Sequence, residues 1–165
     1  MIHPTNKIWL LSGPIHSGKT SALIEFAQQH SRPGGFLCPD IDGKRHLLNL
    51  HSHQLHPFQI DTPISEQDIC IGKYVFSSNT FQIAHTILNS AADQQCSYFI
   101  IDEIGKLELD KKGLEPALSK ALSVLKNTRL ILVVRDYLLK DVIAHYKLDN
   151  ADIITINDLN QICSE

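Results

Sequence analysis

Short apolar segments alternate with amphipathic ones along this chain. Residues 7–11, 97–101 and 130–134 are almost continuously apolar, and 152–156 forms a similar run. Runs of this length predict strands that are covered on both faces, as in a parallel sheet. The first three runs end in polar or glycine residues, which predicts that ligand-binding groups gather at the carboxyl ends of the strands.

Helical periodicity follows several of these runs. Residues 19–30 carry apolar side chains at three- and four-residue steps, and Arg32-Pro33-Gly34-Gly35 stops the pattern. A second helix is expected after Ser77-Ser78-Asn79, which can cap it. Residues 114–125 give the cleanest amphipathic pattern, with Pro116 in the first turn, and a short helix is expected over 137–145.

Residues 35–76 have a different character. Short extended runs at 35–38 and 46–50 flank Asp42-Gly43, a pair typical of hairpin turns, and 71–76 is a further extended segment. We therefore expect residues 1–165 to form a single domain of the α/β class, with a mainly parallel central sheet between helical layers. Residues 35–76 are expected to add a β-hairpin region to it.

A glycine-rich motif lies between the first strand and the first helix. Gly13-Pro-Ile-His-Ser-Gly18-Lys19-Thr20 matches Gly-x-x-x-x-Gly-Lys-[Ser/Thr] at every fixed position. Glycine lets the backbone turn so that successive N–H groups face phosphate oxygens, and the helix N-terminus adds positive charge. The motif predicts a three-layer P-loop NTPase fold and a nucleoside triphosphate ligand. The residues expected to bind it are Gly13, Pro14, Ile15, His16, Ser17, Gly18, Lys19, Thr20 and Ser21.

Two carboxylates follow the second long apolar run. Asp102 stands where a P-loop protein places the acid that holds Mg²⁺, so Thr20 and Asp102 are the expected metal ligands. Glu103 is the adjacent carboxylate and is the candidate for orienting and deprotonating an attacking water. Lys19 is expected to carry charge to the outer phosphates.

Arg135 ends the next apolar run. Its guanidinium is a candidate for stabilising the charge that develops on the γ-phosphoryl oxygens, and a solvated strand-end arginine is the alternative. Lys106 is a weaker candidate for the same role. His16 occupies a variable position of the motif, and its ring is expected to face solvent.

Composition narrows the remaining possibilities. With 15 basic and 18 acidic residues, the net charge of −3 favours neither nucleic acid nor an anionic membrane as a partner. No apolar run reaches the ~20 residues that span a bilayer, and residues 1–7 lack the pattern of a signal peptide. We therefore expect a cytoplasmic protein with reduced, mostly buried cysteines. His46, His51, His53 and His56 lie close together; solvated strand histidines are favoured there over a metal site.

Several segments, taken together, resemble the small thermophilic and cancer-related nucleoside-triphosphatase family. These are the motif from Gly13 to Thr20, Gly34-Gly-Phe36, Ile71-Gly-Lys-Tyr-Val75 and, most specifically, Ile101-Asp-Glu-Ile-Gly-Lys-Leu-Glu-Leu109. The resemblance spans roughly 7–157. It implies slow, Mg²⁺-dependent hydrolysis of ATP, GTP and other nucleoside triphosphates, with Lys19 and Thr20 as nucleotide ligands, Asp102 at the metal and Glu103 as base. The stretch 38–48 departs from the family pattern, and the resemblance assigns no site residue there.

Three other activities remain open on the sequence. A nucleotide or small-metabolite kinase has the same loop, although Arg32, Arg45, Arg129 and Arg135 are too scattered to suggest an arginine-rich lid. A switch GTPase is disfavoured because no Asn-Lys-x-Asp element follows 130–134. A nucleotide-binding regulatory subunit with little turnover is the third alternative, and the oligomeric state is open.

Overall fold

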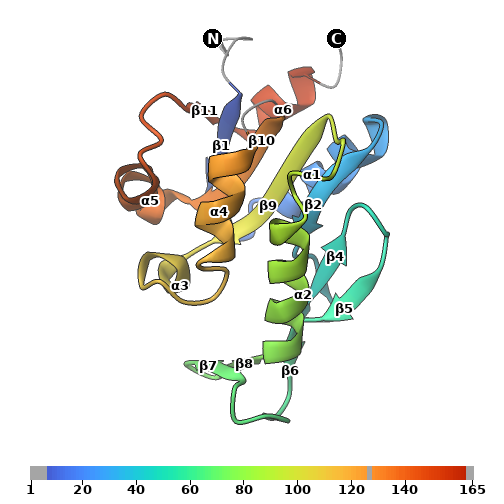
Figure 1. Cartoon of the computed structure of the whole chain (residues 1–165), viewed down its shortest axis with the longest axis vertical. Coiled ribbons are helices and arrows are strands. Elements are labelled where there is room, and N and C mark those ends of the chain that lie inside the picture. Colours follow the sequence, from blue (N-terminus) through green and yellow to red (C-terminus); the bar gives the residue numbers. More distant parts are fainter. Residues whose placement is uncertain (1–6, 126–127, 163–165) are drawn as a thin grey trace.

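A mainly parallel sheet runs through the molecule with helices on both faces (Figure 1). The computed structural model describes residues 7–125 and 128–162. The strands of the main sheet are β1 (Ile8–Gly13), β2 (Pro33–Leu37), β3 (Asp40–Ile41), β4 (Lys44–Asn49), β5 (Leu55–Pro57), β9 (Tyr98–Ile104), β10 (Arg129–Arg135) and β11 (Asp152–Ile154). Within the described residues their order is β11-β1-β10-β9-β2-β4-β3, and β5 pairs with β4.

The central strands are parallel, as the apolar runs predict. β1 lies between β10 and β11, and β9 lies between β10 and β2, all in parallel register. β4 joins β2 antiparallel and in turn pairs antiparallel with β3 and β5. The carboxyl ends of β1, β9 and β10 therefore meet at one edge of the sheet.

Helices cover the two faces of the sheet. On one face lie α1 (Lys19–Gln29) and α6 (Ile156–Ile162), and on the other lie α2 (Ser78–Asn89), α4 (Ala117–Val124) and α5 (Leu139–Tyr146). Alternate residues of β9 enter the two cores: Phe99 and Ile101 pack toward α2 and α4, whereas Tyr98 and Ile100 pack toward α1. Each such buried side chain stabilises the fold by about 1.5–3 kcal/mol.

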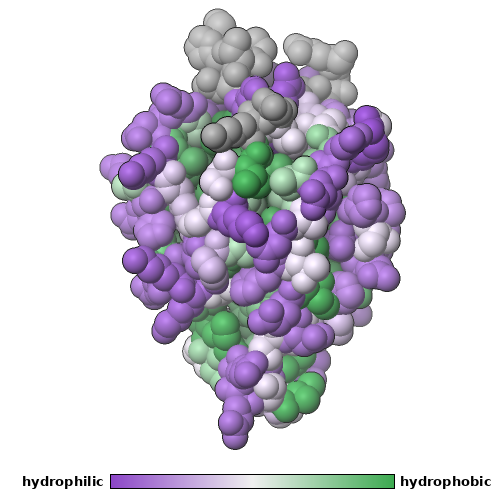
Figure 2. All heavy atoms as spheres, in the orientation of Figure 1, coloured by the Kyte–Doolittle hydropathy of each residue, from purple (hydrophilic) through white to green (hydrophobic). Residues whose placement is uncertain are grey.

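The inserted region carries a second, smaller sheet. Its strands β6 (Gln59–Ile60), β7 (Ile69–Ile71) and β8 (Tyr74–Phe76) pair antiparallel in the order β6-β8-β7. It lies beyond the N-terminal end of α2 in Figure 1, and Figure 2 shows hydrophobic surface around it. Ile64, Ile71 and Tyr74 are the exposed large apolar residues of this part.

Most of the expected elements are present, with shifted limits. The turn at Asp42 and Gly43 joins β3 to β4, and both residues have positive φ (52° and 77°), as a tight hairpin requires. The extended run 71–76 is instead a hairpin, because Gly72 (φ 58°) turns the chain between β7 and β8. Ser77 caps α2 as expected, since its Oγ accepts from the Thr80 N–H.

One strand limit and one helix limit need correction, and two short helical segments were not expected. The expected strand 152–156 ends at Ile154, and α6 begins at Ile156 because Thr155 and Asp158 exchange capping hydrogen bonds. The helix expected from residue 114 begins at Ala117, with Pro116 at its N-cap. Two short helical segments had not been expected as separate elements: α3 (Lys106–Leu109), and the 3₁₀ turn η1 (Asp136–Leu138) that precedes α5.

The thiols of the described cysteines differ in burial. Cys38 is buried, but Cys96 is only partly buried and Cys70 is exposed, so the expectation of mostly buried thiols is wrong for Cys70. All three are free thiols; Cys163 lies outside the described residues. Within the described chain, no group of three or more metal-ligating side chains forms, at the histidines or elsewhere. No helix in that part is long and apolar enough to span a membrane.

Candidate functional site

The phosphate loop connects β1 to α1 without a side-chain cap. Gly18 is the N-cap of α1 and has a left-handed backbone (φ 88°), and in the described part of the chain no side-chain hydrogen bond caps the helix. A helix N-terminus left open in this way is a ready anion site, because its N–H groups and the helix dipole both favour negative charge. His16 also has positive φ (60°) and is exposed, as expected for a variable position of the loop.

Lys19 lies across this loop. Its Nζ donates to the carbonyl oxygens of Gly13 (2.9 Å) and Pro14 (2.6 Å), and to Ser17 Oγ (3.2 Å). Burial lowers the pKa of the ammonium, while the nearby Asp102 carboxylate acts against that shift. These hydrogen bonds therefore hold the ammonium group of Lys19 beside the backbone of the phosphate loop.

The side chain of Asp102 is buried near the end of β9 and forms hydrogen bonds with α1 and with the inserted region. Its Oδ2 accepts from Thr20 Oγ1 (2.9 Å) and from the Cys38 N–H (2.9 Å). Its Oδ1 is buried and has no hydrogen-bond partner among the residues that the structure describes. Burial raises the pKa of the carboxyl, although the two donors oppose the shift. An unpartnered oxygen on a buried carboxylate is costly unless something else binds it.

A bulge in β9 brings Glu103 to the same side as Asp102. The pairing shifts between Ile101↔Leu132 and Ile104↔Val134, so two residues of β9 face one of β10. Glu103 takes a left-handed backbone (φ 66°), which is rare for a residue with a Cβ. Successive side chains of a regular strand point to opposite faces. The extra residue removes that alternation, and both acids line one cavity.

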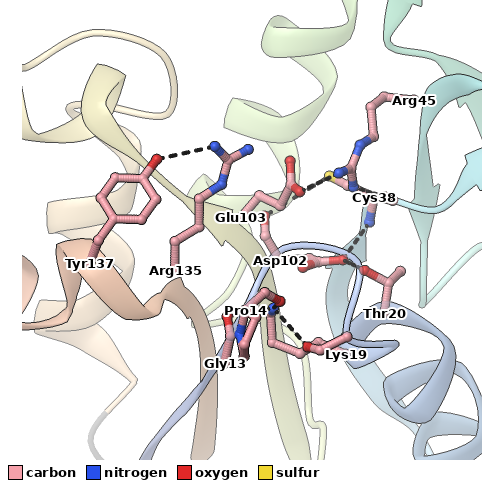
Figure 3. Close-up of polar contacts among 11 residues, drawn as sticks. Gly13, Pro14, Lys19, Thr20, Cys38, Arg45, Asp102, Glu103, Arg135 and Tyr137 are labelled. Atoms are coloured by element: carbon pink, nitrogen blue, oxygen red, sulfur yellow. Dashed lines mark hydrogen bonds and ion pairs between the residues drawn. The ribbon is translucent and has the colours of Figure 1, made fainter.

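Two arginines flank Glu103 (Figure 3). Arg45 from β4 forms an ion pair with it, at 2.8 Å between Nη2 and Oε1, and Arg135 ends β10 with its Nη1 donating to Tyr137 Oη (3.2 Å). Burial raises the pKa of the Glu103 carboxyl, and the positive charge of Arg45 is the main influence against that rise. Arg135 lies close enough to lower it as well.

These side chains surround one cavity of about 320 Å³ at the carboxyl ends of β1, β9 and β10. Of the residues expected at the site, all but three line it: Ile15, His16, Ser17, Gly18, Lys19, Thr20, Ser21, Asp102, Glu103 and Arg135. Gly13 and Pro14 contribute through the carbonyl oxygens that hold Lys19. Lys106 does not line the cavity; its Nζ lies 6.0 Å from the centre of the Tyr137 ring.

The inserted region also contributes to the site, which was not expected from the sequence. Asp40 and Arg45 line the cavity, and the Cys38 N–H binds Asp102, so the stretch 38–48 is part of the site. The signal was available in the Asp42-Gly43 turn. A tight hairpin there folds β4 back on β3 and returns Arg45 to a position opposite Asp40.

The residues present fit a magnesium ion. Mg²⁺ is bound by one or two carboxylates or hydroxyls together with substrate phosphates, rather than by an all-protein cage. Thr20 and Asp102 supply such a pair of hard oxygen ligands beside the phosphate loop. Within the described residues the Oδ1 atom of Asp102 accepts no hydrogen bond, so it is available to bind a metal ion.

Comparison with known proteins assigns the chain to a family. A family model described as "NTPase" matches residues 8–162. The chain belongs to this NTPase family. THEP1 from the hyperthermophile Aquifex aeolicus, a crystal structure, is similar in fold, with a TM-score of 0.69 and 20% identity over 90% of this chain and 89% of that one. No curated protein matches significantly.

Membership confirms the resemblance noted in the sequence. It identifies this NTPase as a nucleotide-binding hydrolase in general terms, and the THEP1 match confirms the P-loop NTPase fold with a mostly parallel sheet.

Proposed function

We propose that this chain hydrolyses ATP, GTP and other nucleoside triphosphates to the diphosphate and phosphate, with Mg²⁺ as cofactor. The observation that carries the proposal is the convergence of the phosphate loop, Asp102, Glu103 and Arg135 on one cavity. No nucleobase-reading motif was found in the sequence, so broad base tolerance is expected.

In this proposal, the chain's own residues bind the triphosphate first. The open N–H groups at the start of α1 and the ammonium of Lys19 bind the phosphate oxygens. Thr20 and Asp102 would hold Mg²⁺, which, when bound, screens the phosphate charge and polarises the phosphoryl oxygens.

Glu103 then acts as general base. Its carboxylate takes a proton from a water as the water oxygen forms a bond to the γ-phosphorus. The bond from that phosphorus to the β–γ bridging oxygen breaks, and the diphosphate leaves with the electron pair. Arg135, on the same cavity wall, stabilises the negative charge that develops on the γ-phosphoryl oxygens.

A hydrolysis panel tests this function. Phosphate release from ATP, GTP, CTP and UTP is measured with Mg²⁺ and with EDTA, on the wild type, Lys19→Ala and Lys120→Ala. Lys120 is an exposed residue of α4 outside the cavity and serves as the matched control. We expect metal-dependent turnover that Lys19→Ala reduces by roughly 100-fold or more and Lys120→Ala leaves unchanged.

Adding nucleosides, nucleotides or sugars to the same assay distinguishes a kinase. Only Arg45 and Arg135 of the four arginines line the cavity, which gives no support for an arginine-rich lid. Phosphoryl transfer to an added acceptor, in excess of phosphate release, would replace hydrolysis as the proposed function.

We further propose that the chain acts as one domain, with the nucleotide as its partner, in the cytoplasm. The contribution of Arg45 to the cavity supports treating 35–76 as part of that domain. The free thiols of Cys38, Cys70 and Cys96 fit a reducing compartment.

A further inference from the structure

Arg45 connects the carboxylate of Glu103 to the backbone of Cys38. Its Nη2 lies 2.8 Å from Glu103 Oε1, and its Nη1 donates to the Cys38 carbonyl oxygen at 2.9 Å. The two side chains are only 22% and 32% exposed, so the pair is shielded from much of the solvent. Because the guanidinium is planar and bound at both Nη atoms, it fixes the direction from which Oε1 is held.

The backbone of Arg45 is itself fixed by the inserted region. Arg45 lies opposite Asp40 in the β3–β4 ladder, and its carbonyl oxygen accepts from the Phe58 N–H (3.0 Å). Phe58 is buried and packs edge-on against Phe76 and Phe81, with ring centroids 5.5 and 4.8 Å away. The arginine is therefore held in place by packing that extends into the smaller sheet and α2.

The other carboxylate oxygen of Glu103 remains available. Within the described part of the chain, no hydrogen bond or ion pair occupies Oε2. A glutamate side chain loses rotamer freedom when it is ordered, and a 1 Å misplacement of a reacting group costs on the order of 100-fold in rate. Holding Oε1 restricts that freedom before the water arrives.

We propose that Arg45 is a positioning residue for Glu103: it binds Oε1, so that Oε2 is directed to the attacking water. The inference rests on the proposed hydrolysis with Glu103 as base. It assigns the inserted region 35–76 a part in the chemistry, because that region supplies Arg45 and fixes its position.

A double-mutant cycle tests this role. Steady-state kcat and KM for Mg·ATP are measured on wild type, Arg45→Gln, Glu103→Gln and the double variant, with thermal melting to confirm that each is folded. Arg45→Gln is expected to lower kcat by about 10-fold or more, given the sensitivity of rate to placement, with KM changed by less than about twofold. In the Glu103→Gln background, Arg45→Gln should have no further effect, because no base remains to be positioned.

Two further variants sharpen the reading. Arg45→Lys keeps the charge but cannot make both contacts, so it should recover part of the lost kcat; it also replaces Arg45→Gln in the cycle if that variant does not fold. Lys44→Gln is the matched control, because Lys44 is the neighbouring cation of β4 and binds Asp61 (2.7 Å) at the surface. It should keep wild-type kcat.

The possible results separate the two proposals. Multiplicative losses in the double variant would show that Arg45 acts on its own, on the phosphoryl oxygens, and would overturn the positioning role alone. A higher kcat in Arg45→Gln, or a change confined to KM, would also overturn it. If Glu103→Gln kept the wild-type rate, Glu103 would not be the base, and the proposed mechanism would fail together with the inference.

Discussion

Replacing Asp102 by asparagine should make the protein more stable while removing its metal-dependent activity. Both hydrogen bonds to the carboxylate end on one oxygen, Oδ2, so the amide oxygen of asparagine can accept from Thr20 and from the Cys38 N–H in the same way. The amide nitrogen then takes the place of Oδ1, the buried oxygen without a partner. The substitution removes a buried charge and retains the contacts that hold the side chain.

The size of the effect follows from two opposing costs. A buried charge that its neighbours compensate only in part costs several kcal/mol, whereas an unpaired neutral donor costs about 1–3 kcal/mol. We expect a net gain of about 1–3 kcal/mol, which corresponds to a rise in melting temperature of roughly 2–10 °C for a domain of this size.

The dependence on pH has a definite sign. Because burial raises the pKa of Asp102 in the folded state, its ionisation costs stability, and the cost is absent at pH values below the ordinary aspartate pKa. It grows as the pH rises from that value to the folded-state pKa and is constant above it. The melting temperatures of wild type and Asp102→Asn should therefore be close in acid and furthest apart at neutral pH.

Thermal unfolding followed by circular dichroism measures both effects. Asp102→Ala is the control, since it leaves Thr20 Oγ1 and the Cys38 N–H without their acceptor and should melt below wild type. Adding Mg²⁺ with a non-hydrolysable triphosphate should stabilise the wild type by about 2.7 kcal/mol at 100 times the Kd and stabilise Asp102→Asn much less. An asparagine variant that melts below wild type at neutral pH, or a difference independent of pH, would refute the reasoning.

Four other changes have defined outcomes. Arg135→Ala should lower kcat by roughly 10-fold or more while nucleotide affinity, measured with a fluorescent analogue, is largely retained; an equal loss of affinity would contradict a transition-state role. Gly35→Ala should prevent stable folding, because Gly35 has φ +86° and an added Cβ would collide with the Ile100 backbone. Gly43 has φ +77° but open space around it, so Gly43→Ala should lower the free energy of unfolding, measured with denaturant, by only about 1 kcal/mol or somewhat more. The buried carboxylate of Glu108 accepts from the N–H groups of Gly105 (2.8 Å) and Leu114 (3.1 Å). Glu108→Gln would place an amide donor against one of these donors and should destabilise the fold by about 1–3 kcal/mol. Glu66→Gln, at an exposed site, should leave the stability unchanged. Asp68 accepts from Ser78, Ser65 and Ile64, which hold its pKa well below the ordinary range, so it stabilises the fold above the ordinary aspartate pKa and less as the pH falls through it; Asp68→Asn should lower the melting temperature at neutral pH, with the difference shrinking in acid.

Much of the fold could be predicted because local and tertiary preferences agree in the parallel core. The apolar runs at β1, β9 and β10 are buried on both faces, and the loop motif lies between strand and helix as its chemistry requires. The helix α6 was missed because Ile153 and Ile154 suggest that the strand continues through Ile156. Thr155 and Asp158 end the strand and form a helix N-cap pair, which could have been recognised in the sequence.

The site was predictable where its residues are close together in the sequence. Lys19 and Thr20 are placed by the loop, and Asp102 by the end of β9. Arg45 was not found, because its role depends on an antiparallel hairpin that returns it across the sheet edge to a glutamate 58 positions further along the chain, at 103. The hydrophobic periodicity of the sequence does not indicate the contact between these two residues.

The surplus residue in β9 shows how such a site can be lost without losing its motif. Deleting one residue between Ile101 and Ile104 would restore regular pairing with β10, and it would rotate the end of the strand so that neighbouring side chains again pointed to opposite faces. A chain altered in this way would still contain a glycine loop and an acid at the strand end, and a motif search would still score it as an enzyme. Ile101 and Ile104 are both buried and lie three positions apart, with the two acids between them. This spacing is therefore as diagnostic of the arrangement as the acids themselves.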